Sequence, residues 1–202
     1  MDLDAERVTT ALKLVGQLLT QRRQGPFHLV VCGGSALVAR GLISRSTIDV
    51  DLLANVNQVD GEYKISPLPY PMPADLAKAA RDVAGEMDLR ANWLNGNASL
   101  MFPELGDLPE WFWREVERRA YGMDLTVDYV SRRGQILLKT YAALNREEER
   151  DAEDLLALAP DGAETLEAVR WVLANMKMLE HRERLPHVLG ILGHEDIIAE
   201  IG

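Results

Sequence analysis

The sequence predicts a mixed α/β (α+β) fold, in which a small mixed sheet is flanked by helices and followed by a C-terminal helical lobe. Two observations lead to this prediction. In the first two thirds of the 202-residue chain, segments with apolar residues at helical spacing alternate with short apolar or β-branched segments. Beyond that point only helical patterns follow. We therefore expect an α/β core over residues 1–135 and a helical lobe over residues 136–202, packed on the core.

Hydrophobic periodicity and glycine or proline breaks place the individual elements. The expected helices cover residues 4–24, 35–40, 74–87, 136–145, 149–158, 163–184 and 186–201. The expected strands cover residues 27–32, 47–53 and 123–131. Prolines and asparagines make residues 55–73 a predicted loop, with room for a short strand at 62–65. Because this loop directly follows the second strand, it is a candidate lid or acceptor-binding element.

The composition excludes several classes of protein. The net charge of −10 and the pI near 4.9 disfavour a protein that wraps a long nucleic acid, because such a protein needs a basic face. Residues 1–50 hold six Lys or Arg against four Asp or Glu, so an anion-binding cleft would draw on this part. The single cysteine, Cys32, rules out a disulfide within one chain, and no Cys/His zinc pattern occurs. The acidic N-terminus lacks a signal-peptide core and no apolar stretch is long enough to span a bilayer, so we expect a soluble cytoplasmic protein.

Two glycines join the first expected strand to a short helix, in the segment Gly33-Gly34-Ser35. Glycine allows close backbone approach to a ligand, and the N–H groups at a helix start attract phosphate. The Ser35 hydroxyl adds a further donor. Glycine turns before helices are common, so by itself this segment is equally an ordinary structural turn.

Asp49 and Asp51 follow Ser35 by 14 and 16 positions and lie on the second expected strand. Side chains two apart on a strand point the same way, so the two carboxylates would project from one face. Such close carboxylates repel each other unless a cation lies between them, and a Mg²⁺ pair held in this way serves in-line nucleotidyl transfer. The alternative for the pair alone is a strand end with two solvated aspartates.

Together these segments resemble the signature of polymerase-β-type nucleotidyltransferases, namely Gly33-Gly34-Ser35 followed by Asp49-Val50-Asp51. The small bacterial group related to type E abortive-infection toxins is the most similar. The segment Asn92-Trp93-Leu94-Asn95 resembles a Trp-Leu-Asn segment of that group. Lys139, Arg146, Asp151 and Asp154 resemble its late helical Lys…Arg…Asp-x-x-Asp motif. The resemblance runs from about residue 28 to 158 and implies a nucleotidyltransferase core.

The resemblance implies a role for each matching residue. Ser35 and the turn at Gly33 and Gly34 would hold the β- and γ-phosphates, and Asp49 and Asp51 would hold Mg²⁺. A third carboxylate on a later strand would be Asp128, which would join the metal site and help to deprotonate the acceptor. Asp124 competes with Asp128, because the two share a strand face.

Two basic residues have competing interpretations. Lys139 could contact the triphosphate, or it could belong to a network of ion pairs that joins two helices with Arg146, Asp151 and Asp154. Arg45, on the loop before Asp49, could neutralise a phosphate or remain a solvated loop arginine. The glutamate run 147–149 is expected to be a solvated helix start.

The functional expectation is therefore a Mg²⁺-dependent enzyme that transfers NMP from an NTP to an acceptor hydroxyl. The resemblance implies a tRNA end, a protein or a small molecule as the acceptor, and a toxin–antitoxin or phage-defence setting with a cognate partner. The alternative is a nucleotide-binding or partner-binding module that keeps the fold without efficient turnover. A third carboxylate close to Asp49 and Asp51 would distinguish the enzyme from the module.

Overall fold

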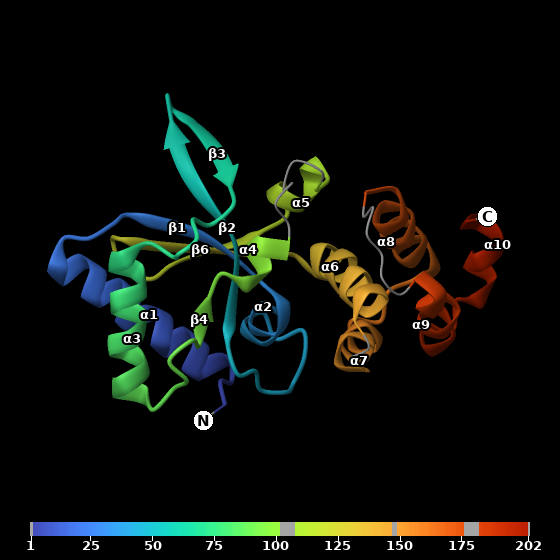
Figure 1. Ribbon diagram of the computed structural model, residues 1–202, viewed down its shortest axis with the longest axis horizontal. Coiled ribbons are helices and arrows are strands. Elements are labelled where there is room, and N and C mark those ends of the chain that lie inside the picture. The colour runs from blue at the N-terminus through green and yellow to red at the C-terminus, as the bar shows by residue number, and fades with distance from the viewer. Residues whose placement is uncertain (1, 102–107, 147–148, 176–181, 202) are drawn as a thin grey trace. The chain divides into compact units, whose positions relative to one another are not determined.

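The computed structural model describes residues 2–101, 108–146, 149–175 and 182–201, which form a mixed α/β structure. This confirms the predicted fold class. The chain divides into two compact units, Met1–Ser131 and Arg132–Gly202. The boundary lies four residues before the position expected from the sequence. The first unit contains the sheet, and the described part of the second unit is helical (Figure 1).

The strands of the described residues build one six-stranded mixed sheet in the order β3-β2-β1-β6-β5, with β4 paired to β2. β1 is central, because it runs antiparallel to β2 and parallel to β6. The strands are β1 (Phe27–Cys32), β2 (Val50–Val59), β3 (Glu62–Ser66), β4 (Leu94–Asn95), β5 (Glu117–Ala120) and β6 (Leu125–Tyr129). The helices of the first unit are α1 (Ala5–Arg22), α2 (Gly33–Ala39), α3 (Ala74–Met87), α4 (Asn97–Met101) and α5 (Glu110–Arg114).

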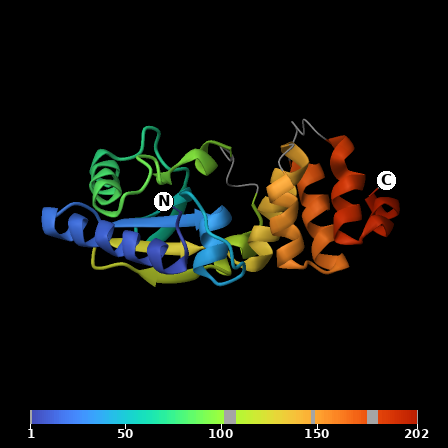
Figure 2. The ribbon, with the colours of Figure 1, turned by 90° about the horizontal axis from the view of Figure 1, so that it is seen from below.

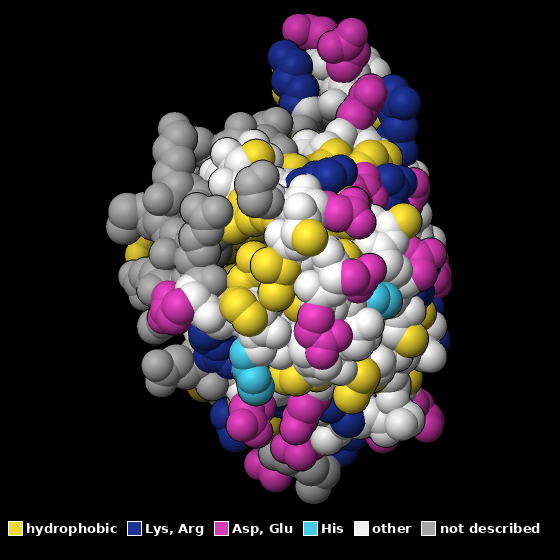
Figure 3. Space-filling view, turned by 90° about the vertical axis from the view of Figure 1, so that its right-hand side faces the viewer, with side chains coloured by type: hydrophobic (Ala, Val, Ile, Leu, Met, Phe, Trp, Pro, Cys, Tyr) yellow, Lys and Arg dark blue, Asp and Glu magenta, His cyan; other side chains and the backbone are white. Residues whose placement is uncertain are grey.

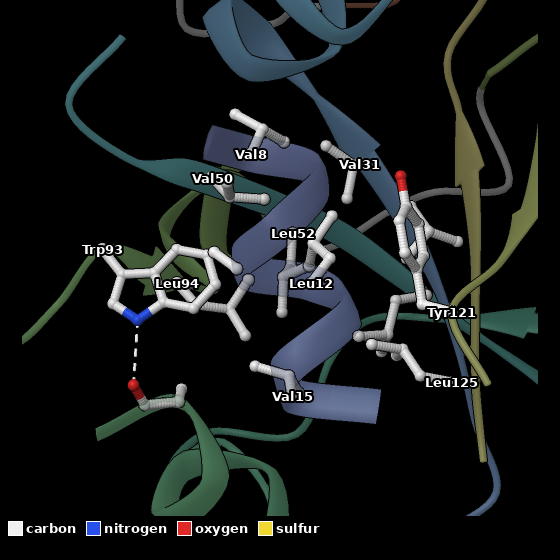
Figure 4. Close-up of a cluster of buried hydrophobic side chains, with 14 of the residues drawn as sticks. Val8, Leu12, Val15, Val31, Val50, Leu52, Trp93, Leu94, Tyr121 and Leu125 are labelled. Atoms are coloured by element: carbon white, nitrogen blue, oxygen red, sulfur yellow. Dashed lines mark hydrogen bonds between the residues drawn. The ribbon is translucent and has the colours of Figure 1, made fainter. Parts of the chain in front are cut away.

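The core of the first unit lies between the sheet and the helices α1 and α3. Each strand sends alternate side chains to this face, because successive side chains of a strand point to opposite sides. Val31 of β1 and Leu52 of β2 meet Leu12 of α1 there (Figure 4). Trp93 is fully buried in the same cluster, and its indole nitrogen donates a hydrogen bond of 2.9 Å to the Ala80 carbonyl. The opposite face of the sheet is thus the one that can carry polar side chains.

The second unit consists of helices in its described part, and several of them lie side by side (Figure 2, orange to red). They are α6 (Arg132–Asn145), α7 (Glu149–Leu158), α8 (Gly162–Asn175), α9 (Leu185–Leu192) and α10 (Ile198–Ile201), with 3-10 turns η2 (Arg182–Arg184) and η3 (Glu195–Ile197). Part of the helix expected at 163–184 lies outside the described residues. None of the helices in the described ranges has the length and apolar character required to span a bilayer.

The structure differs from the sequence prediction around the second strand. β2 begins at Val50 and runs to Val59, whereas the prediction ended this strand at residue 53 and made residues 55–73 a loop. The first part of that stretch instead forms a hairpin with β3 that extends away from α1 and α3 (Figure 1). Asp60 and Gly61 both have positive φ, of 54° and 83°, and an Asp-Gly pair with positive φ is the usual two-residue hairpin turn.

Candidate functional site

The turn between β1 and α2 is the centre of the candidate site. α2 begins at Gly33, two residues earlier than predicted, and Gly33 has a φ of 68°, which favours glycine. A Cβ atom at Gly33 would lie 3.0 Å from Oδ2 of Asp51. The carboxylate of Asp51 therefore rests directly against the glycine turn, so the structure brings two sequence-predicted site residues into contact.

A cation lies beside the same turn. A Cβ atom at Gly34 would lie 3.2 Å from Nη2 of Arg45 and 3.1 Å from Oγ1 of Thr47. Nη1 of Arg45 also donates a hydrogen bond of 3.0 Å to the Ser46 carbonyl, which fixes the guanidinium close to the backbone. Arg45 is half-buried, so its charge is partly shielded from water. The predicted phosphate-binding turn thus has a positive group next to it.

Asp51 is placed by strand pairing. It stands opposite Cys32 in the β1–β2 ladder and opposite Asn95 in the β2–β4 ladder. Residues in register share a face, and Val31 and Leu52 occupy the core face, so Asp51 lies on the other one. Asp49 precedes β2 by one residue, and its carbonyl accepts a hydrogen bond from Thr47 Oγ1 at 3.2 Å. Both aspartates are half-buried, so a ligand can still reach them.

Ser35 is fully buried in the first turn of α2. Its hydroxyl donates a hydrogen bond of 3.2 Å to the Cys32 carbonyl, the last residue of β1. This bond closes the turn that carries Gly33 and Gly34. In this structure Ser35 therefore stabilises the turn, and its contact with phosphate stays a prediction.

Asp128 lies on the same sheet face as Asp51 but on a different strand. It stands opposite Val30 on β6, whereas Asp51 stands opposite Cys32 on β2, with β1 between them. From strand geometry the two Cα atoms are about 12 Å apart. Asp124 precedes β6, and its Oδ2 accepts a hydrogen bond of 2.7 Å from Thr20. Because Asp124 lies beside the start of β1 rather than its end, Asp128 is the nearer of the two candidates for the third carboxylate.

Asp128 has two partners that the sequence did not indicate. Arg118 of β5 binds both of its carboxylate oxygens, at 2.8 and 2.9 Å, and His28 Nε2 lies 2.8 Å from Oδ2. Asp128 is buried, and its hydrogen bonds to Arg118 raise the pKa of that guanidinium. Tyr63 of β3 packs against both His28 and Arg118. This cluster holds Asp128 on the face of the sheet opposite the α1 and α3 core.

Lys139 is part of an ion-pair network in the second unit. Its Nζ lies 2.6 Å from Asp151 Oδ1 and 2.7 Å from Asp154 Oδ2. All three side chains are buried, and they join α6 to α7. The structure thus shows the network that was the alternative interpretation of the late helical motif, while the proposed triphosphate contact of Lys139 stays a prediction.

Asp49 and Asp51 supply two carboxylates at the candidate site. Within the described ranges, no three His, Cys, Asp or Glu side chains form a group that could hold a metal ion. Mg²⁺ is commonly bound by one or two carboxylates together with phosphate oxygens and water. Asp49 and Asp51, next to the glycine turn and Arg45, match that arrangement.

Comparison with known proteins gives no further guide. No protein-family model, no curated protein and no solved structure matches this chain. The interpretation of the site consequently rests on its own residues. Sequence reasoning missed His28, Arg118 and Thr47 as neighbours of the site, and only the arrangement of the strands reveals them.

Proposed function

We propose that the protein is a Mg²⁺-dependent nucleotidyltransferase. The acceptor hydroxyl oxygen would bond to the α-phosphorus of an NTP, the bond from that phosphorus to the β-phosphate bridging oxygen would break, and pyrophosphate would leave. The hydroxyl proton would pass to a base on the protein or to water. The product is the acceptor carrying NMP.

The contact between Asp51 and Gly33 carries this proposal. The chain places a partly exposed carboxylate against a glycine turn at the start of a helix, with Arg45 on the neighbouring glycine. A carboxylate alone would repel phosphate, and the combination of a carboxylate pair, backbone N–H groups and a cation is suited to a metal-bound triphosphate.

Each residue has a role in the proposed reaction. Asp49 and Asp51 would hold Mg²⁺, which neutralises charge on the phosphoryl groups when bound. The backbone at Gly33 and Gly34, together with Arg45, would bind the leaving phosphates and keep them in line. Asp128 would accept the proton of the acceptor, and its contacts with Arg118 and His28 hold its carboxylate in place.

The setting that we propose follows the resemblance to abortive-infection nucleotidyltransferases. The acceptor would be a tRNA end, a protein hydroxyl or a small molecule, and the chain would work in a toxin–antitoxin or phage-defence system with a cognate partner. NTPs are abundant in the cytoplasm, so the reaction would take place there. The acidic net charge of −10 favours a small or protein acceptor over a long RNA.

A second candidate function is a nucleotide-binding or partner-binding module without efficient turnover. The position of Asp128 favours this module. Its carboxylate is bound by Arg118 and His28, and β1 lies between its strand, β6, and the strand of Asp51, β2. A protein that binds a magnesium nucleotide needs Asp49 and Asp51, whereas transfer also needs a base at the acceptor.

Calorimetric titration with Mg²⁺ and each NTP tests the binding part of the proposal. We expect wild type to bind at least one NTP, and Asp51→Asn to weaken that binding at least about tenfold, or about 1.4 kcal/mol. Asp60→Asn is the matched control, since it removes the same charge at the hairpin turn, where the positive φ suits asparagine. If wild type binds no NTP in the presence of Mg²⁺, both the enzyme and the nucleotide-binding module fail.

Transfer itself is tested with α-labelled NTPs, total tRNA and cell extract. For the enzyme we expect a labelled acceptor with wild type and none with Asp128→Asn, while nucleotide binding by that variant stays near the wild-type value. Tight NTP binding without any labelled product would favour the binding module.

A further inference from the structure

A pocket of about 260 Å³ lies at the edge of the sheet beside the candidate site. It is formed by three stretches of the first unit, namely the proline-rich segment after β3, the middle of α3, and the segment that contains β4. The residues that carry the argument are Leu68, Tyr70, Ala77, Arg81, Leu94 and Asn95. Nothing in the roles assigned above uses this pocket.

Hydrogen bonds and close packing hold the walls of the pocket in place. Trp93 Nε1 donates to the Ala80 carbonyl and thereby ties the β4 segment to α3 (Figure 4). The Leu68 backbone N–H donates to Ser99 Oγ at 2.7 Å, which ties the proline-rich segment to α4. Leu68 also packs on Gly96, where a Cβ atom would lie 2.8 Å from its Cδ2. The pocket is therefore part of the folded unit.

Strand register connects the pocket to the candidate site. Asn95 lines the pocket and stands opposite Asp51 in the parallel β2–β4 pair. Across the sheet the order is the glycine turn at Gly33, then Asp51, then Asn95, with neighbouring strands about 4.8 Å apart. A ligand whose phosphates lie at the glycine turn and whose α-phosphate lies near Asp51 would thus extend its other end across β4, the edge of the sheet, towards the pocket.

The chemistry of the lining suits a flat heterocycle. Leu68 and Leu94 are buried and apolar, and Tyr70 has 80% of its surface exposed, which leaves its ring available for stacking. Arg81 is exposed at the pocket and makes no ion pair with the described residues. The apolar residues would contact the faces of a base, and the Arg81 guanidinium could bind an acceptor atom on its edge.

Asn95 adds an unsatisfied donor between the pocket and Asp51. Its Oδ1 accepts a hydrogen bond of 3.0 Å from the Asn97 N–H, which fixes the side-chain amide. Its Nδ2 is buried and has no hydrogen-bond partner among the described residues. A buried amide N–H group without a partner is costly, and a partner supplied by a ligand or by its water would remove that cost.

We infer that this pocket binds the nucleoside end of the NTP, with the base held between the proline-rich segment and α3. The inference rests on the proposed function, because the phosphates fix the direction in which the nucleotide lies. It assigns a specificity role to the 67–73 segment, and it separates nucleoside recognition at β4 from phosphate recognition at the glycine turn.

The test compares a full nucleotide with its phosphate chain alone. Ala77 is half-buried on α3 and lines the pocket, so Ala77→Phe would fill it. Ala74→Phe is the matched control on the same helix, since Ala74 is exposed and does not line the pocket. Calorimetry is performed with Mg²⁺ and either inorganic tripolyphosphate or each of the four NTPs. Arg81→Gln is a second variant at an exposed position, which should fold normally.

We expect wild type to bind its preferred NTP at least about tenfold more tightly than tripolyphosphate, since the base adds contacts in the pocket. Ala77→Phe should remove that advantage and leave tripolyphosphate affinity unchanged, Arg81→Gln should reduce the advantage, and Ala74→Phe should change neither. Equal NTP affinity in wild type, Ala77→Phe and Arg81→Gln would overturn the inference and leave the proposed function standing. Loss of tripolyphosphate affinity in Ala77→Phe would also overturn it, because the pocket would then not be specific for the nucleoside. Wild type that binds neither ligand would instead refute the proposed function, and the inference with it.

Discussion

Gly33 is the residue at which backbone conformation and proposed chemistry meet. Its φ of 68° is disfavoured for residues with a side chain, and its Cα faces the Asp51 carboxylate. Gly41 has nearly the same φ, 67°, but an added Cβ atom there would have no neighbour within 4 Å. Comparing substitutions at these two glycines therefore distinguishes the free-energy cost of the left-handed backbone from the effect of the contact with Asp51.

We predict that Gly33→Ala and Gly41→Ala each lower the free energy of unfolding by about 1 kcal/mol, because both force alanine into the left-handed region. Only Gly33→Ala should also weaken Mg²⁺–NTP binding, because its Cβ displaces Asp51. Urea unfolding gives the first quantity and calorimetric titration the second. Equal nucleotide affinity in the two variants would show that the position of Asp51 is unimportant for binding.

At the residue scale, the sequence predicted residues that belong to one short motif but not contacts between distant strands. Gly33, Asp49 and Asp51 are separated by fewer than twenty positions, and their motif predicted that they belong to one site; in the structure the Asp51 carboxylate lies against Gly33. The partners of Asp128 were not predicted. His28 is 100 positions away and reaches Asp128 only because β1 and β6 run parallel and in register. No local pattern encodes that register.

Among the elements, α6 and α7 are joined by the buried Lys139 network. We predict that Lys139→Met lowers the free energy of unfolding by about 3–5 kcal/mol, because Asp151 and Asp154 would remain buried without their cation. The triple variant Lys139→Met/Asp151→Leu/Asp154→Leu should recover most of that loss, since no unpaired charge remains. Denaturant unfolding of both variants measures these differences. A loss of less than about 1 kcal/mol for Lys139→Met would argue against a structural network and for a role of Lys139 in binding.

The start of α8 is tied to the start of α6 by Glu164 and Arg132. Arg132 binds both carboxylate oxygens of Glu164, at 2.6 and 3.0 Å, and also the Leu158 and Ala159 carbonyls. The hydrogen bonds from Arg132 hold the pKa of Glu164 below its usual value of 4.5. Because the folded-state pKa is lowered, the ionised form stabilises the fold above pH 4.5, and this contribution is lost as the pH falls through the folded-state pKa.

Glu164→Gln should accordingly cost about 1 kcal/mol at pH 7, a modest value because the pair is partly exposed to water. The difference from wild type should shrink when the pH is lowered below 4.5. Glu153→Gln is the control, since it removes the same charge at an exposed position of α7. Thermal unfolding from pH 3 to pH 7 provides the measurement, and a difference that is constant over this range would contradict the assignment.

Elements with a strong internal pattern were predicted well. The bounds of β1, α3 and α7 agree with the prediction, because β1 is a short continuous apolar run between Pro26 and Gly33, and α3 and α7 have apolar residues at helical spacing. β5 was missed because Glu117–Ala120 carries three charged residues on an edge strand, where side chains on both faces stay partly exposed. For the β2–β3 hairpin, the short strand at 62–65 was predicted, but residues 55–59 were assigned to a loop because of the prolines that follow in the same segment.

At the scale of the whole molecule, acidic charge is spread over both units, whereas the candidate phosphate site lies in the first unit. Asp and Glu side chains are scattered over the face seen in Figure 3, with hydrophobic side chains between them. The first unit holds 13 Lys or Arg against 18 Asp or Glu, and the second unit holds nine against fourteen, so each unit has a net charge of −5. Arg45 and the glycine turn belong to the first unit, as the charge count of residues 1–50 suggested. An acidic protein can therefore still present a local site for a phosphate.

Each unit also has buried leucines of its own. The main hydrophobic cluster runs from Leu3 to Tyr129 and lies entirely within the first unit, whereas Leu155 is fully buried in the second. A unit with its own core can unfold as a separate cooperative step. The matched substitutions Leu12→Ala and Leu155→Ala remove the same atoms from fully buried positions, one in each unit.

We predict that scanning calorimetry of the full chain resolves two transitions. Leu12→Ala should lower only the transition of the first unit and Leu155→Ala only that of the second, with each substitution costing about 2–5 kcal/mol, because each leaves a cavity in one core. Mg²⁺ with the preferred NTP should raise only the transition that Leu12→Ala lowers, because ligand that binds the folded form stabilises the unit that contains its site. A single transition that both substitutions shift would show that the two units unfold as one, and a ligand shift of the second transition would place nucleotide contacts, such as that of Lys139, in the helical unit.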